Sequence, residues 1–187
     1  MGIAQLSETN MQTANIPTHW LLIEAFGVTA SFVMYHLLAL KKREGWLVYV
    51  LASFAIIYLM VMKDSWITVI NQLMMIVLGF KNYFVFGQSR QPFYGKALDW
   101  LSLPVYLGSF FLLKDFSFGS ITEVLMWGVI IAKTLTLGKG QSNGWIWQIL
   151  QQILSIVFGW QREIYLYVLK SVFQLLQGVW GYWRWRG

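Results

Sequence analysis

The chain contains two copies of one unit, because residues 45–84 align with residues 144–183 at a constant offset of 99 residues and without a gap. Under that offset the step Lys63-Asp64 falls on Arg162-Glu163, with glycines on either side. Further equivalent positions are Gly45-Trp46 with Gly144-Trp145, Trp66 with Tyr165, Gly79 with Gly178, Tyr83 with Tyr182, and Glu24 with Glu123. A basic–acidic step that repeats in register indicates a duplication, so the fold should contain two similar halves.

The composition indicates that lipid, rather than water, surrounds most of the chain. Of the 187 residues, 57% are apolar and 12% are charged, and the mean hydropathy is +0.55. A soluble domain carries about 25% charged residues. The net charge of +6 does not indicate a nucleic-acid partner, because the basic residues lie at the ends of apolar runs and form no stripe. The chain has no cysteine, which excludes disulfides and thiolate chemistry.

Seven apolar runs reach or approach the length of about 20 residues that a membrane-spanning helix needs. They cover residues 17–40, 45–62, 65–87, 98–114, 119–138, 143–160 and 164–184. The breaks between them are short, so no soluble domain is inserted. We therefore predict an all-α integral membrane protein with seven transmembrane helices. Residues 1–16 form a polar N-terminal segment in which we expect no cleavable signal.

The offset predicts a 3+1+3 arrangement of these helices. Residues 17–87 form the first three-helix repeat, residues 98–114 a linking helix, and residues 119–187 the second three-helix repeat. Three helices reverse the direction of the chain and the linking helix restores it, so both repeats run the same way through the membrane. Parallel repeats related by an axis along the membrane normal are a transporter architecture with the substrate between the copies.

Lys and Arg are distributed unevenly between the two predicted sides of the membrane. With the N-terminus outside, the inner side holds Lys41, Lys42, Arg43, Arg90, Lys96, Lys139, Arg184 and Arg186, and the outer side holds only Lys63, Lys114 and Arg162. An excess of basic residues marks the cytoplasmic side. We therefore predict an outside N-terminus and a cytoplasmic C-terminus.

Amide side chains recur inside the predicted spans, where a polar group is costly unless it has a partner. The candidate substrate-binding residues are Asn71, Gln72, Gln148, Gln152, Lys170, Gln174 and Gln177. Amides offer donors and an acceptor, and with tryptophan and phenylalanine nearby they suit a hydroxylated, ring-bearing solute better than a bare ion. The alternative is that these amides only join helices, through hydrogen bonds of about 0.6 kcal/mol each.

Lys170 is the one cation among these candidates, and it aligns with Asn71 in the predicted outer half of the bilayer. We hypothesise that Glu24 or Glu123 neutralises it or takes part in gating. Each glutamate also lies within a turn or two of a helix start, so an interfacial position remains the alternative.

With only two histidines and no acid-rich cage, we expect no metal or cofactor. We also expect no enzyme, because no Ser/His or His/Glu grouping has a catalytic spacing.

The chain resembles the PnuC family of vitamin-precursor transporters over nearly its whole length. The similar stretches are Ile23-Glu24-Ala25-Phe26-Gly27, Gln72 with the aromatic-rich run after it, Trp145 through Ser155 to Tyr165, and Gly181 with Trp185. The resemblance implies a 3+1+3 fold similar to the sugar-transporting SWEETs. It also implies facilitated uptake of nicotinamide riboside across the bacterial plasma membrane, with a cytoplasmic kinase trapping the product. A homo-oligomer is left open.

The chain departs from the riboside carriers at positions that this resemblance assigns to the site. Those carriers have a tryptophan followed one turn later by an asparagine on the sixth helix, where this chain has Gln148 and Gln152. Gly79 stands where an asparagine is expected, and Trp180 precedes the final glycine. Contacts to the base should therefore differ. Thiamine, riboflavin or a nucleoside is the alternative solute, and a structural membrane subunit is a further alternative.

Overall fold

The computed structural model describes residues 18–62, 66–88, 92–109, 111, 118–161 and 165–186. In these residues it contains seven helices: α1 (Thr18–Ala39), α2 (Glu44–Met62), α3 (Trp66–Val85), α4 (Phe93–Ser109), α5 (Phe118–Gly138), α6 (Gly144–Gln161) and α7 (Tyr165–Arg186). The predicted all-α class is confirmed. The polar segment 1–16 lies outside the described residues.

Three of the described helices are long and apolar enough to cross a membrane. They are Glu44–Met62, Trp66–Val85 and, within α5, Ile121–Gly138. A shorter apolar stretch covers Ala25–Ala39 of α1. Length and composition therefore single out α2 and α3 of the first predicted repeat and most of α5 of the second.

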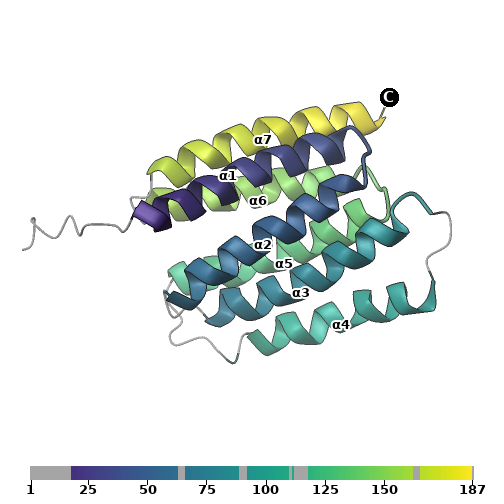
Figure 1. Cartoon of the computed structure of the whole chain (residues 1–187), viewed down its shortest axis with the longest axis horizontal. Helices are drawn as coiled ribbons and strands as arrows, with labels where there is room; N and C mark the ends of the chain where they lie inside the picture. Colours follow the sequence, from purple (N-terminus) through teal and green to yellow (C-terminus); the bar gives the residue numbers. More distant parts are fainter. Residues whose placement is uncertain are drawn as a thin grey trace, which may run out of the picture.

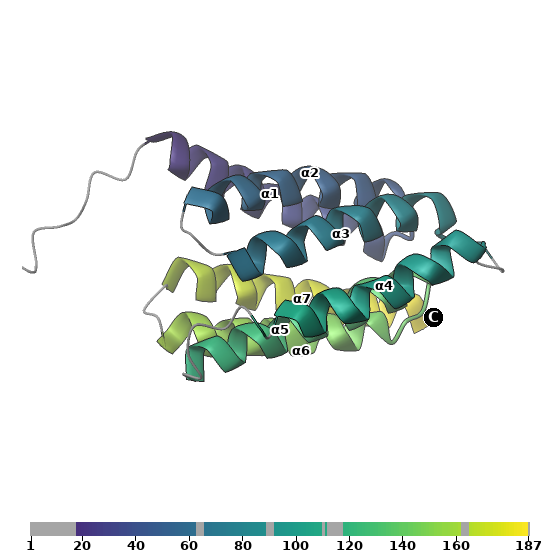
Figure 2. The same cartoon turned by 90° about the horizontal axis from the view of Figure 1, so that it is seen from below.

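Six of the helices form a closed ring, and α4 packs on the outside of it. Around the ring, α1 packs on α2, α2 on α3, α3 on α5, α5 on α6, α6 on α7, and α7 on α1. Figure 2 shows α1, α2 and α3 as one layer and α5, α6 and α7 as the other, with α4 in front of the two. Helix α4 contacts only α3 and α5 closely. In this order α1 lies opposite α5, since two helices separate them on either side.

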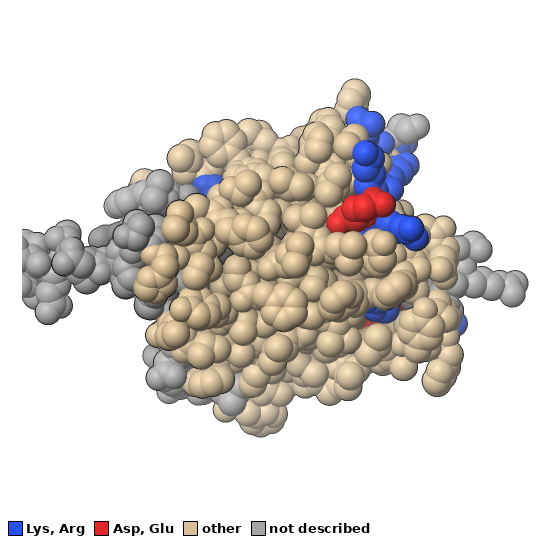
Figure 3. Space-filling model, viewed as in Figure 1, with Lys and Arg blue, Asp and Glu red and all other residues tan. Residues whose placement is uncertain are grey.

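The two layers run in the same direction along the bundle. Helix α1 begins at one end and α7 terminates at the other (Figure 1). We call the end where α1, α3, α5 and α7 terminate the basic end. Figure 3 shows Lys and Arg gathered there and very few charged side chains on the visible flank. The exposed basic residues described at this end are Lys41, Lys42, Arg43, Lys96, Lys139, Arg184 and Arg186.

The α1–α2 turn and the α5–α6 turn have the same backbone geometry at the offset of 99 residues. The Lys41 N–H donates to the Leu38 carbonyl at 2.9 Å, and the Gly140 N–H donates to the Leu137 carbonyl at 2.9 Å. Lys41 and Gly140 both have a positive φ, of 58° and 71°. A left-handed residue with these bonds ends a helix in the Schellman motif. Both turns therefore stop their first helix in the same way and return the chain antiparallel.

Helix α4 begins five residues before the predicted start at residue 98, at Phe93. The Pro92 carbonyl accepts hydrogen bonds from the N–H groups of Gly95 (3.0 Å) and Lys96 (3.3 Å). Proline is tolerated at a helix start because its missing N–H has no partner there anyway. The apolar run excluded Gly95 and Lys96, although both continue a helix without difficulty. Residue 110 and residues 112–114 of the prediction lie outside the described residues.

Aromatic side chains fill the ring at the basic end. Trp46 of α2 and Trp145 of α6 are fully buried there, and both belong to a cluster with Leu38, Leu137 and Trp185. The Trp145 and Trp185 rings meet edge to face, with centroids 5.7 Å apart. Trp46 and Trp145 are equivalent positions at the offset of 99 residues, so each half contributes its equivalent tryptophan to this cluster, and the second half adds Trp185.

Gly181 allows α7 to approach this cluster closely, and replacing it with alanine should destabilise the fold. A Cβ at residue 181 would lie 2.6 Å from ring atoms of Trp145, which the cluster holds in place. Overpacking of this kind costs about 1–3 kcal/mol. We expect Gly181→Ala to lower the thermal unfolding midpoint of the detergent-purified protein.

Gly27→Ala is the matched control for this prediction. A Cβ at residue 27 meets nothing within 4 Å of it in the described structure, and alanine in a helix is more favourable than glycine by about 1 kcal/mol. The control should unfold at the same temperature as the parent protein or higher. Equal midpoints for the two variants would show that α7 and α6 do not pack as closely as described.

Candidate functional site

Gln148 and Gln152 lie one turn apart on α6, and only 0% and 1% of their surfaces are exposed. Neither amide atom of Gln148 has a hydrogen-bond partner among the described residues, nor does Nε2 of Gln152. The indole Nε1 of Trp145, one turn earlier, is likewise unpartnered in the described part of the chain. We call Trp145, Gln148 and Gln152 the α6 amide face. A buried polar group without a partner costs about 1–3 kcal/mol, so this face is arranged for something other than stability.

Two other predicted amides hold neighbouring helices together. The Gln72 Nε2 on α3 donates to the Ser53 Oγ on α2 at 2.6 Å. The Gln174 Nε2 on α7 donates to the Ser31 Oγ on α1 at 2.6 Å. Both bonds are short, and both cross a seam between adjacent helices of the ring. These two residues therefore have the geometry of interhelical joints.

Gln177 and Asn71 each use one end of the amide for a backbone bond. The Gln177 Nε2 donates to the Phe32 carbonyl of α1 at 3.2 Å, and the Asn71 Nδ2 donates to the Ile67 carbonyl of its own helix at 2.9 Å. The oxygens of both amides, Gln177 Oε1 and Asn71 Oδ1, are buried without a donor among the described residues. Each residue therefore keeps one acceptor that a further group could use.

The predicted charged residues belong to three different helices, Lys170 to α7, Glu123 to α5 and Glu24 to α1. Lys170 is partly exposed in the second turn of α7, toward the end opposite the basic end. The Glu123 Oε1 accepts a hydrogen bond of 2.8 Å from the Thr68 Oγ1, which joins α5 to α3. The side chain of Glu24 lies outside the described part of the chain. The neutralisation of Lys170 by a glutamate stays a prediction.

Lys133 of α5 is a buried cation, 4% exposed, that our sequence analysis did not single out. Its Nζ donates to the Tyr35 hydroxyl at 2.8 Å and to the Gln151 Oε1 at 2.7 Å. Since α1 and α5 lie opposite each other, the bond to Tyr35 crosses the ring. The centroids of the Tyr35 and Trp145 rings are 6.4 Å apart. Because Lys133 bonds to Tyr35, it borders the α6 amide face. A lysine inside the apolar run 119–138 was the available signal, because charge is costly in lipid.

Asp99 of α4 forms a second charged cluster, at the basic end. Its Oδ1 accepts a bond of 2.5 Å from the Lys81 Nζ of α3, and its Oδ2 lies 3.6 Å from the Lys139 Nζ at the end of α5. The Lys81 side chain is completely buried. The carboxylate therefore ties the linking helix to both layers of the bundle. Neither Asp99 nor Lys81 was a predicted site residue.

Two hollows of the described structure lie apart from the α6 amide face. The larger is a groove of ≈ 1050 Å³ lined by α4, α5 and the end of α3, with Asp99, Tyr106 and Ile131 in its wall. A smaller hollow of ≈ 480 Å³ lies between α1 and α7, beside Phe32 and Trp180. Neither is lined by a residue of the α6 amide face. We place the candidate site at the α6 amide face, because its buried amide atoms lack polar partners among the described residues.

Comparisons of this chain with protein-family models, with curated proteins and with solved structures found no match in any of the three. A functional assignment therefore depends on the chemistry of the residues themselves.

Proposed function

We propose that this chain is a membrane transporter that facilitates uptake of a small, hydroxylated, ring-bearing solute by alternating access. The solute would be a nicotinamide-riboside-like vitamin precursor, or alternatively thiamine, riboflavin or a nucleoside. The observation that carries this proposal is the α6 amide face, where Gln148 and Gln152 are buried with unpartnered amide atoms inside a ring of helices. A polar solute that bonds to these atoms would recover the free energy that their burial costs.

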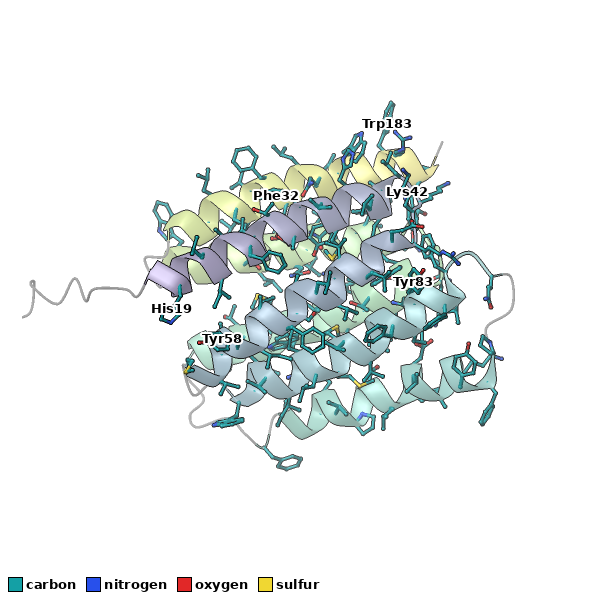
Figure 4. All side chains as sticks on the ribbon, in the orientation of Figure 1. His19, Phe32, Lys42, Tyr58, Tyr83 and Trp183 are labelled. Carbon is teal, nitrogen blue, oxygen red and sulfur yellow. The ribbon has the colours of Figure 1, made fainter. Side chains whose placement is uncertain are left out.

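A membrane location is supported by the surface of the bundle. Large apolar side chains are exposed along its flank, among them Phe84, Trp100, Leu125, Leu150 and Leu176. Aromatic residues lie at both ends: Figure 4 shows the exposed Tyr58 at one end, and the half-buried Tyr83 and the exposed Trp183 at the other. Tryptophan and tyrosine favour the two membrane interfaces, and basic residues favour the cytoplasmic side. We propose seven spans in a bacterial plasma membrane, with the basic end in the cytoplasm and the N-terminus outside.

The two layers of the bundle provide the moving parts in this proposal. At the basic end the solute would be closed in by the tryptophan cluster around Trp46 and Trp145, which belong to different layers. Rocking α1–α3 against α5–α7 would separate these two side chains and open the site to the cytoplasm. The Gln72–Ser53 hydrogen bond lies within one layer and would be unaffected by this motion. The Gln174–Ser31 hydrogen bond links α7 to α1, which belong to different layers, and would act as a hinge. Transport would be uncoupled, and a kinase would trap the product.

A structural membrane subunit is the second candidate function. It is favoured by the same two joints, because they show amides of this chain acting as links between helices. The two candidates differ in whether the isolated protein moves a solute.

Uptake by vesicles that contain only this protein tests the proposed function. We expect saturable entry of at least one of labelled nicotinamide riboside, thiamine, riboflavin and uridine, ending at equal concentrations inside and outside because no ion is coupled. Vesicles without protein are the control for leakage. Absence of saturable flux for all four solutes would reject the transporter and leave the structural subunit.

A further inference from the structure

The interior next to α6 has more unpartnered donors than unpartnered acceptors. In the described residues, the donors Trp145 Nε1, Gln148 Nε2 and Gln152 Nε2 lack an acceptor, whereas Gln148 Oε1 is the one acceptor of this face without a donor. The three residues share one side of α6 because their spacing of three and four residues follows the helical repeat. A ligand complementary to this face must bring acceptors, which are carbonyl or carboxylate oxygens.

Lys133 adds a positive charge to the same donor-rich interior. A protonated lysine has three N–H donors and no acceptor, and the described structure gives two of them to Tyr35 and Gln151, which are neutral. No carboxylate of the described residues forms an ion pair with Lys133. By contrast, the other buried lysine, Lys81, is paired with Asp99. Among the described residues, Lys81 has a counter-charge and Lys133 has none.

We infer that the site selects solutes that carry a carboxylate, or another anionic acceptor group, which supplies the missing counter-charge of Lys133. This inference rests on the proposed transport function and narrows its substrate class to carboxylated relatives of the solutes named above, in preference to nicotinamide riboside and thiamine themselves. The anionic group would accept the third N–H of Lys133, and other oxygens of the solute, in ring carbonyls or ribose hydroxyls, would accept from Gln148 and Gln152. A permanently cationic solute, such as thiamine or nicotinamide riboside, would instead place like charges together inside a low-dielectric site. Charge-assisted bonds are stronger than neutral ones, so the discrimination should be large.

Pairs of solutes that differ only in this group test the inference with the full-length protein in vesicles. The first pair is nicotinamide riboside and the riboside of nicotinic acid, in which a carboxylate replaces the carboxamide. The second pair is uridine and its 6-carboxylate. We expect the carboxylated member of each pair to enter at least about tenfold faster at low concentration, a ratio that corresponds to roughly 1.4 kcal/mol.

Lys133→Gln should abolish this preference, because glutamine can bond to Tyr35 and Gln151 without a charge. Lys42→Gln is the matched control: Lys42 is exposed at the basic end (Figure 4), and its loss should leave the preference unchanged. Binding is measured separately as the shift of the thermal unfolding midpoint caused by each solute in detergent. The carboxylated solutes should stabilise the parent protein and Lys42→Gln, but not Lys133→Gln.

The outcomes separate this inference from the proposed function. Equal or faster entry of the uncharged or cationic members would overturn the inference and leave the transporter standing. No flux, together with stabilisation of the parent protein by the carboxylated solutes alone, would reject transport and support the anion site. Neither flux nor stabilisation would overturn both. If Lys133→Gln does not fold, the uptake rates of the two solute pairs by the parent protein still test whether the site prefers a carboxylate.

Discussion

Gln148→Leu is expected to reduce solute uptake at low concentration by at least about tenfold, while leaving the stability of the protein unchanged or higher. Both amide atoms of Gln148 are buried without a partner among the described residues, so leucine of similar size removes no bond within the chain. It would remove the bonds to the proposed solute, each worth about 0.5–1.5 kcal/mol. Uptake by vesicles and the thermal unfolding midpoint in detergent measure the two effects.

Gln174→Leu is the matched control, because Gln174 is also a buried glutamine but has a partner. Its Nε2 donates to the Ser31 Oγ at 2.6 Å, and leucine would leave that seam without its bond at a cost of about 1 kcal/mol. Gln174→Leu should therefore unfold at a lower temperature than Gln148→Leu. If Gln148→Leu is the less stable of the two, its amide joins helices and the candidate site loses its main support.

Lys81→Met is expected to lower the free energy of unfolding by about 3 kcal/mol, the cost of removing one partner of a buried ion pair. The Lys81 side chain is completely buried, and the Asp99 carboxylate it bonds has little exposure to water. Of its two described ion-pair partners, the Asp99 carboxylate would then retain Lys139, whose Nζ lies 3.6 Å from Oδ2. Chemical unfolding in mixed detergent micelles measures the change, and α4 should detach first because Asp99 is its charged link to α3.

Two further variants distinguish charge pairing from packing in this cluster. Lys139→Gln should cost at most about 1 kcal/mol, because the Lys139 side chain is 40% exposed and its pairing is screened by water. The double variant Lys81→Met, Asp99→Leu should recover most of the loss, since a well-packed apolar pair is often as stable as a buried ion pair. A double variant no more stable than Lys81→Met would mean that the side chains matter for their shape and not for their charge.

Much of the fold could be predicted from the sequence because it depends on local chemistry. Each helix except α4 begins and ends within two residues of its apolar run. The offset of 99 residues also anticipated that Gly45 and Gly144 would occupy the same position, and a Cβ at either would meet the leucine seven residues earlier, at 2.8 and 2.6 Å. The start of helix α4 was predicted wrongly because a search for apolar runs does not include the proline before a helix or a lysine within its first turns.

The candidate site was predictable only in part. The sequence placed Gln72, Gln148, Gln152 and Gln174 inside helices, but it does not show which of these amides has a hydrogen-bond partner. The structure separates them: Gln72 and Gln174 bond to serines on adjacent helices, whereas Gln148 and Gln152 have unpartnered amide atoms in the described chain. Spacing along one helix reveals which residues share a face, but not what the facing helix presents.

The sequence by itself determined the all-α class, the seven helices and the internal register between the two halves. These follow from the length of the apolar runs and from a pattern that recurs along the chain. Only the tertiary structure decided that Lys133 bonds to Tyr35 across the ring and that Asp99 joins Lys81 to Lys139. Both contacts link residues on different helices, and the partner of a buried charge depends on which helices become neighbours rather than on the chemistry of either segment alone.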